Sequence, residues 1–233
     1  MECSTVFVID STAESREATA RILFSERHRV LKFETAEAFL ADRRCNLPGC
    51  LLVDVHLPGL GGIGLQDVLK AQPCPQPVIF LTEKCDVQTS VAAMKAGAID
   101  FLLKSTSARE LLAAVRCGIW CDSERRRTFE LRASIQHRVD ALTPRERDVM
   151  TYVIRGKLNK QIAAVLGTGE QNVKMHRARM MLRMRARSVP ELVQMGALVG
   201  MSVDLTPKSA PKPTERTSPG SRWILTSAVP MMA

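Results

Sequence analysis

Short apolar segments alternate with amphipathic segments through the first half of the chain, and this alternation restricts the fold more than any other feature. Each apolar segment has the length and the content of valine, isoleucine, leucine and phenylalanine that are typical of buried β-strands. Strands that alternate with helices form a parallel sheet covered on both faces. We therefore predict an α/β, doubly wound, five-stranded parallel sheet. Its strands are Thr5–Ile9, Arg29–Phe33, Cys50–Val55, Pro77–Leu81 and Ile99–Leu102, and its helices are Ala13–Ser25, Ala36–Asp42, Gly62–Ala71, Val87–Ala96 and a last one from Ala108 onward.

Polar side chains stand where four of these strands end. They are Asp10, Asp54, Thr82 and Lys104. In a doubly wound sheet the functional crevice lies at the carboxyl ends of the strands, so these side chains should meet there. Two carboxylates, a hydroxyl and an ammonium suit a hard cation together with an anionic group, and one carboxylate can serve as a nucleophile towards phosphorus. Any one of them alone would be better explained as a cap at the end of its strand, but four in register indicate a site.

A second pattern lies between Gln161 and Met184. An apolar helix ends at Gly167, and after a short break a cationic helix follows, with Val173, Met181 and Met184 facing inward. This arrangement is typical of a helix-turn-helix, whose second helix enters the major groove of DNA.

The surrounding sequence completes an all-α domain of four helices. Thr143, Pro144 and Glu146 form a capping box with proline in the first turn, so a helix begins there. Asn159 is expected to cap the next helix, Gly169 or Glu170 to begin the cationic one, and Ser188 to precede the fourth.

Positive charge is concentrated in this second domain. Residues 141–201 contain eleven basic and four acidic residues, an excess of +7, whereas residues 1–120 contain 13 basic and 14 acidic residues. Such asymmetry favours nucleic acid as the partner. In the helical segment that joins the domains, Arg125–Arg127 have Asp122, Glu124 and Glu130 at nearby helical spacings and are interpreted as a solvated face.

Cysteine content and hydropathy indicate the compartment. Seven irregularly spaced cysteines do not form a disulfide framework, and Cys117 and Cys121 share a helical face without the further ligands that a metal site needs. The amino terminus has no signal-peptide pattern and no apolar run has the length of a membrane span, so we expect a cytoplasmic protein that does not associate with membranes.

The segments VFVID, CLLVDVHLPGLGGIGLQ, PVIFLT and VAAMKAGAIDFLLK resemble a response-regulator receiver domain, which has a flavodoxin-like fold. LTPRERDVM, GKLNKQIAAVLG and NVKMHRARM resemble the LuxR-type helix-turn-helix, and together the segments resemble FixJ-like two-component regulators over residues 4–200. The resemblance implies that Asp54 is the phosphoacceptor, that Asp10, Thr82 and Lys104 complete the pocket, and that Thr82 and Phe101 form a switch pair. It also implies that Asp10 and Asp54 bind Mg²⁺.

Two positions depart from the family pattern. Ser11 stands where the family has an acid that binds the metal, so the affinity for Mg²⁺ should be weak. Ser105 replaces the proline that usually follows the lysine, which leaves the position of Lys104 less fixed.

The resemblance also divides the chain and assigns contacts with DNA. We predict a receiver domain at 1–120, a helical linker at 121–140, a DNA-binding domain at 141–201 and a disordered tail at 202–233, rich in proline, serine and threonine. Lys174, Met175 and Ala178 are expected at base edges. Lys160, His176, Arg177 and Arg179 are expected at phosphates.

These features predict a transcription regulator, not an enzyme, whose dimerisation and DNA binding respond to phosphorylation of Asp54. Its expected partners are double-stranded DNA, a sensor histidine kinase and a second copy of the chain on activation, with RNA polymerase as a further candidate. Ser11 favours an alternative in which the receiver is a phosphorylation-independent dimerisation module. A remote alternative is a flavodoxin-like enzyme, but no glycine opens the first strand–helix turn to a phosphate.

Overall fold

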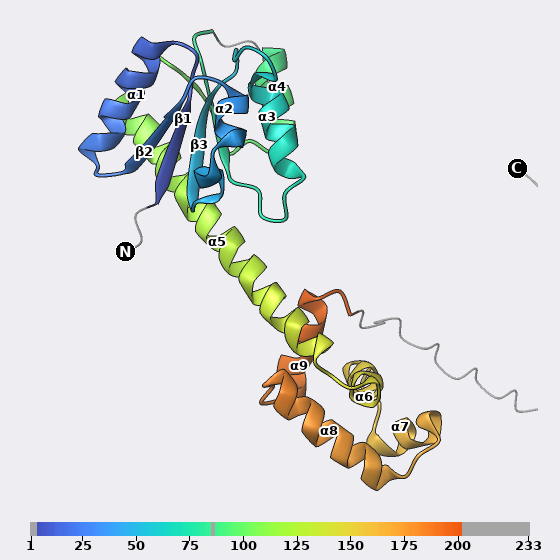
Figure 1. Cartoon of the computed structure of the whole chain (residues 1–233). Coiled ribbons are helices and arrows are strands. Elements are labelled where there is room, and N and C mark those ends of the chain that lie inside the picture. The colour runs from blue at the N-terminus through green and yellow to red at the C-terminus, as the bar shows by residue number, and fades with distance from the viewer. Residues whose placement is uncertain (1–3, 85–86, 202–233) are drawn as a thin grey trace, which may run out of the picture.

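The computed structural model describes residues 4–84 and 87–201, which form two domains joined by one long helix (Figure 1). The predicted disorder of residues 202–233 falls outside these residues. Within the described ranges, no helix has both the length and the hydrophobicity needed to span a bilayer.

The first domain contains the predicted five-stranded sheet, all parallel, in the order β2-β1-β3-β4-β5. This result confirms the predicted fold class. Three strands are shifted by one residue from the predicted ranges, and the shift makes Asp54 and Thr82 the last residues of their strands. The strands are β1 (Thr5–Ile9), β2 (Arg29–Phe33), β3 (Gly49–Asp54), β4 (Val78–Thr82) and β5 (Asp100–Leu103).

Alternating side chains of each strand build two separate cores. On one face Phe7 and Ile9 pack with residues of α2, α3 and α4, and on the other Val6 and Val8 pack with residues of α1 and α5. This period of two is the reason why the central strands β1, β3 and β4, which are buried on both faces, are mostly apolar. The helices are α1 (Ala13–Ser25), α2 (Ala36–Ala41), α3 (Gly61–Lys70), α4 (Val87–Lys95) and α5 (Ala108–Asp140), with a 3-10 turn, η1, at Arg43–Asn46.

Helix α5 belongs to both domains. It begins with a capping box in which Ser107 and Glu110 exchange hydrogen bonds, and it continues without interruption through Gly118. A Cβ at Gly118 would lie 2.9 Å from the Cβ of Cys50, so glycine is what allows α5 to lie this close to β3. The far end of α5 contributes Ile135 and Val139 to the core of the second domain.

A buried acid ties the middle of α5 to the receiver sheet. Asp122 is 1% exposed, and its Oδ2 accepts hydrogen bonds from the backbone N–H of Gly49 (2.8 Å) and from Nε of Arg126 (2.8 Å). The guanidinium of Arg126 also donates to the carbonyl oxygens of Asn46 and Leu47. The first half of the linker helix is therefore fastened to the base of the sheet.

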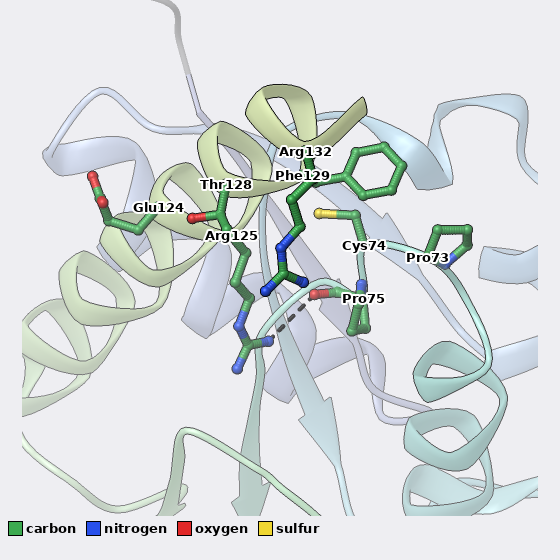
Figure 2. A pocket seen from close by; sticks show the side chains of 8 residues that line it. All are labelled: Pro73, Cys74, Pro75, Glu124, Arg125, Thr128, Phe129 and Arg132. Atoms are coloured by element: carbon green, nitrogen blue, oxygen red, sulfur yellow. Dashed lines mark hydrogen bonds between the residues drawn. The ribbon is translucent and has the colours of Figure 1, made fainter. Parts of the chain in front are cut away.

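The neighbouring arginine makes a similar contact. Figure 2 shows Arg125 Nη1 donating to the carbonyl oxygen of Pro75 at 3.3 Å, beside a cavity of about 450 Å³ between the Pro73–Pro75 loop and α5. The interpretation of Arg125–Arg127 as a solvated face is thus correct for Arg125 and Arg127, which are both exposed, and wrong for Arg126, which is half-buried. Arg125 and Arg126 satisfy carbonyl oxygens that the sequence pattern does not reveal.

We expect Asp122→Ala to destabilise the receiver domain by ~2–4 kcal/mol, because it leaves the N–H of Gly49 and the guanidinium of Arg126 without their acceptor. Urea unfolding followed by circular dichroism measures the effect. Glu124→Ala, one turn from Arg127 on the exposed side of the same helix, should change the stability by less than about 0.5 kcal/mol. Equal effects of the two variants would contradict this account.

The second domain is helical, as predicted, and the end of α5 completes its core. Thr143 and Glu146 form the predicted capping box, with Pro144 in the first turn of α6. Gly167 adopts the left-handed conformation (φ 62°) that ends α7 and opens the turn to α8. The helices are α6 (Pro144–Ile154), α7 (Asn159–Leu166), α8 (Glu170–Met184) and α9 (Val189–Leu198).

One local prediction for this domain was wrong. Asn159 does not cap α7: the cap is Leu158, whose N–H donates to Oε1 of Gln161. On α8 Met184 is fully buried and Met181 packs, partly buried, against the same core, as predicted. Met180, which the helical pattern did not single out, is fully buried as well.

Candidate acidic pocket and nucleic-acid interface

Four strand ends bring the predicted pocket residues together. Nζ of Lys104 lies 2.8 Å from Oδ2 of Asp10 and 2.8 Å from Oδ2 of Asp54, and the backbone N–H of Lys104 donates to the carbonyl oxygen of Thr82. The two acids are nearly buried, at 2% and 6% exposure. One ammonium therefore pairs with two carboxylates in a site with little access to water, and it balances only one of their two negative charges.

The other carboxylate oxygens are also hydrogen-bonded. Oδ1 of Asp10 accepts from the N–H of Thr12 (2.8 Å), and Oδ1 of Asp54 accepts from the N–H of His56 (3.0 Å). Oδ2 of Asp10, which contacts Lys104, also accepts from the hydroxyl of Ser15 (2.6 Å). Sequence reasoning missed Ser15. Its position in the first turn of the helix that follows Asp10 was the available signal, because that turn lies over the end of the strand.

The predicted switch residues lie beside this pocket. The hydroxyl of Thr82 donates to the carbonyl oxygen of Lys84 at 2.9 Å, so it is engaged with its own loop. Phe101 is half-buried, and its ring lies 6.3 Å from that of Phe80, tilted by 49°. Thr82 ends β4, which lies between the other two strands. It pairs on one side with β3, the strand of Asp54, and on the other with β5, the strand of Phe101. The role of Thr82 and Phe101 as a switch stays a prediction.

Electrostatics hold Lys104 in its charged form. Burial acts to lower the pKa of its ammonium, but the hydrogen bonds and charges of Asp10 and Asp54 outweigh burial and raise the pKa above its ordinary value. A folded-state pKa above the unfolded one contributes stability that is complete below about pH 10.4 and is lost as the pH rises through the folded pKa. The site thus keeps its cation throughout the neutral range.

The donor set of the pocket fits a weakly bound Mg²⁺. The metal is usually held by one or two carboxylates, with water and phosphate oxygens completing its shell, and Asp10 and Asp54 supply two. Among the described residues no group of three or more acidic, histidine or cysteine side chains converges on a metal position. Ser11, partly exposed next to Asp10, adds no carboxylate.

The candidate nucleic-acid interface is the outer surface of α7 and α8. Of the residues predicted to contact DNA, Lys160, Lys174, Met175, Ala178 and Arg179 are exposed on this surface. Lys160 lies on α7, and the other four follow one another along one side of α8, the second helix of the pair, which is the helix that enters the groove in this motif.

Two of the side chains predicted to contact phosphate do not point outward from this surface. Nη1 of Arg177 donates to Oδ1 of Asn159 at 2.9 Å and so joins α8 to α7. His176 is half-buried, and its Nδ1 has no hydrogen-bond partner within the described part of the chain. These side chains are oriented towards the domain, and contacts with phosphate would require them to turn outward.

Sequence reasoning did not identify the main polar anchor behind this interface. Glu146 is 2% exposed, although it belongs to a capping box, and its Oε2 accepts from the N–H of Thr143 (2.9 Å) and from Nη1 of Arg183 (2.8 Å). The arginine also donates to the carbonyl oxygen of Ala141. This ion pair fixes the carboxyl end of α8 against the start of α6.

Comparison with known proteins connects the two sites. Residues 6–116 match the model of the response regulator receiver domain, and residues 140–196 match that of the bacterial regulatory proteins of the LuxR family. Nodulation protein W of Bradyrhizobium diazoefficiens is 37% identical over 201 residues, covering 86% of this chain and 88% of the relative. The transcriptional regulatory protein FixJ of Azorhizobium caulinodans is 38% identical and covers 87% and 97%. The chain belongs to the FixJ-type response regulators.

Solved structures agree with this membership. The response regulator StyR, known at low resolution, is 39% identical with a TM-score of 0.72, over 83% of this chain and 98% of StyR. Full-length FixJ from B. japonicum is 36% identical with a TM-score of 0.52, over 85% and 98%. This chain is thus a two-component response regulator that combines a receiver domain with a LuxR-type DNA-binding domain, and its family is one of transcription regulators.

Proposed function

We propose that phosphorylation of Asp54 by a partner histidine kinase promotes pairing of two protomers in the cytoplasm and thereby strengthens binding to double-stranded DNA. The observation that carries this proposal is the position of Nζ of Lys104, 2.8 Å from the carboxylates of both Asp10 and Asp54 in a buried pocket. A cation held there is placed to stabilise the charge of a transferred phosphoryl group.

The chemistry is a transfer from histidine to aspartate. An oxygen of Asp54 attacks the phosphorus of the phosphohistidine, the new P–O bond forms as the P–N bond breaks, and the bonding electron pair leaves with the imidazole. Lys104 then exchanges its contact with Asp54 for one with the phosphoryl oxygens. Mg²⁺, held by Asp10 and Asp54, neutralises charge on the phosphoryl group when it is bound.

The conformational change that follows phosphorylation begins at Thr82 and ends at an exposed apolar face of the receiver domain. The hydroxyl of Thr82 leaves the carbonyl oxygen of Lys84 and turns to the phosphoryl group, which makes room for Phe101 to move inward. Exposed apolar side chains on α4 and β5 offer a surface on which a second copy can pair. They are Val87, Val91, Met94 and Leu103. RNA polymerase remains a further expected partner.

Acetyl phosphate with Mg²⁺ tests this proposal. We expect intact mass spectrometry to find one phosphoryl group on the wild-type chain and none on Asp54→Asn, which lacks the nucleophilic oxygen. Asp100→Asn is the matched control, because Asp100 is a partly buried acid at the start of β5 that caps its own strand. Dimerisation and DNA affinity should rise only in the chains that are modified. Equal DNA binding with and without phosphorylation would contradict phosphorylation control.

A second candidate function rests on Ser11. With both carboxylates paired with Lys104 and no third acid joining them among the described residues, the receiver can serve as a pairing module that needs no phosphoryl group. Ser11→Asp separates the two functions. Under phosphorylation control it should raise the yield of phosphorylated protein and reporter-gene expression in cells, whereas under the second function expression stays unchanged.

A further inference from the structure

An apolar stripe runs along the outward side of the recognition helix α8. Met175 is 41% exposed and Leu182 is 79% exposed, and the exposed Ala178 lies between them at helical spacings of three and four residues. All three face away from the buried residues Val173 and Met180. A single exposed apolar side chain needs no explanation, but a stripe on the side that faces a partner does.

Several polar side chains around this stripe have partners within the protein. Arg177 is bonded to Asn159, Lys174 pairs with Glu170 at 3.4 Å, and Nδ1 of His176 is buried. The first half of α8 also exposes Gln171 and Arg179, which stand before Met175 and after Ala178 in the helix. What it presents at the centre of its outer side is the thioether of Met175 and the methyl group of Ala178.

The surroundings of the stripe determine what covers it. Exposed cations border it, namely Lys160 on α7 and Arg179 on α8, and the domain carries a strong positive charge. An apolar protein surface would leave these cations facing no counter-charge. The major groove of DNA offers phosphates on both rims, and between them one apolar group on the base edges, the 5-methyl group of thymine.

We infer that Met175 and Ala178 determine sequence specificity by apolar contact with the 5-methyl groups of thymine. The preferred site of this protein then contains thymines where the amino-terminal half of α8 enters the groove. The inference rests on the proposed DNA binding and names the chemical feature that is read. Leu182 is thirteenth in the helix and lies towards its carboxyl end, so it contacts no base.

The experiment replaces thymine by uracil, which pairs in the same way but lacks the methyl group. The full chain first selects its preferred duplex from a random pool, and each thymine of that duplex is then changed to uracil in turn. Affinity should fall by about fourfold for each methyl group contacted, the effect of burying one methyl-sized group. In Met175→Ala this uracil penalty should disappear at one base pair, and in Leu182→Ala it should persist everywhere.

Three outcomes overturn the inference in distinguishable ways. If a duplex is selected but uracil costs nothing at any position, DNA binding stands and methyl recognition is wrong. If a uracil penalty persists in Met175→Ala, and also in Ala178→Gly, other residues read the methyl group. If no duplex is selected at all, the proposed DNA binding fails together with the inference.

Discussion

Gly49→Ala should prevent the receiver domain from folding. At Gly49, φ is +151°, and an added Cβ would lie 1.7 Å from the carbonyl oxygen of Thr5, with further backbone atoms within 3 Å. The register of β1 with β3 pairs these two residues, so the clash cannot be relieved without separating the strands. We expect a loss of more than about 4 kcal/mol, at the extreme of what single substitutions do. Circular dichroism should show loss of the sheet.

Gly97→Ala is the matched control for this substitution. Gly97 also has a positive φ, of +88°, but nothing lies within 4 Å of its added Cβ. It should therefore cost only the conformational strain of about 1 kcal/mol. If both variants unfold alike, backbone conformation rather than close approach to Thr5 is the cause.

The second large effect is expected at Glu146. Glu146→Ala removes the acceptor of the N–H of Thr143 and the partner of Arg183, and should destabilise the DNA-binding domain by ~2–3 kcal/mol after allowance for the partial exposure of the arginine. The control is Glu191, which accepts a hydrogen bond from the N–H of Arg187 at the start of α9. It is a capping acid like Glu146, but it is less buried. Glu191→Ala should cost about 0.5–1 kcal/mol. Thermal unfolding of residues 141–201 within the full chain distinguishes the two.

The effect of Glu146 should depend on pH. Burial acts to raise the pKa of its carboxyl group, but the hydrogen bonds of Thr143 and the charges of Arg183 and His176 outweigh burial and lower the pKa. A lowered folded-state pKa contributes stability that is complete above the unfolded value of about 4.3 and is lost as the pH falls through the folded pKa. The Tm difference between wild type and Glu146→Gln should shrink between pH 6 and about pH 3. A constant difference would exclude the carboxylate charge as its source.

Much of this architecture follows from local sequence patterns. The central strands β1, β3 and β4 were predicted to within one residue because they are buried on both faces, which makes each a nearly continuous apolar run. The pocket was predicted because parallel strands end at one edge, so Asp10, Asp54 and Lys104 had to meet. The capping box of Thr143 and Glu146 is a purely local signal.

What escaped prediction depends on contacts between distant parts of the chain. Asp122 resembles the other charged residues of its helix, and only its contact with Gly49, 73 residues away, makes it a buried acceptor. Arg177 looked like a phosphate contact because its partner Asn159 was assigned to a cap. No periodicity distinguishes such side chains from solvated ones, because burial is decided by the packing of the whole domain.

The attachment of α5 to the base of the sheet gives this helix the properties of a lever. Within the described part of the chain, Arg126 is the last residue of α5 that hydrogen-bonds to the receiver domain. Asp140 ends the helix at the DNA-binding domain. The intervening 14 residues span roughly 21 Å at 1.5 Å per residue. A tilt of about 10° at the fastened end therefore moves the far end by about 4 Å, close to the spacing of one base pair. A change too small to disturb the pocket is thus large enough to shift the recognition helix along DNA.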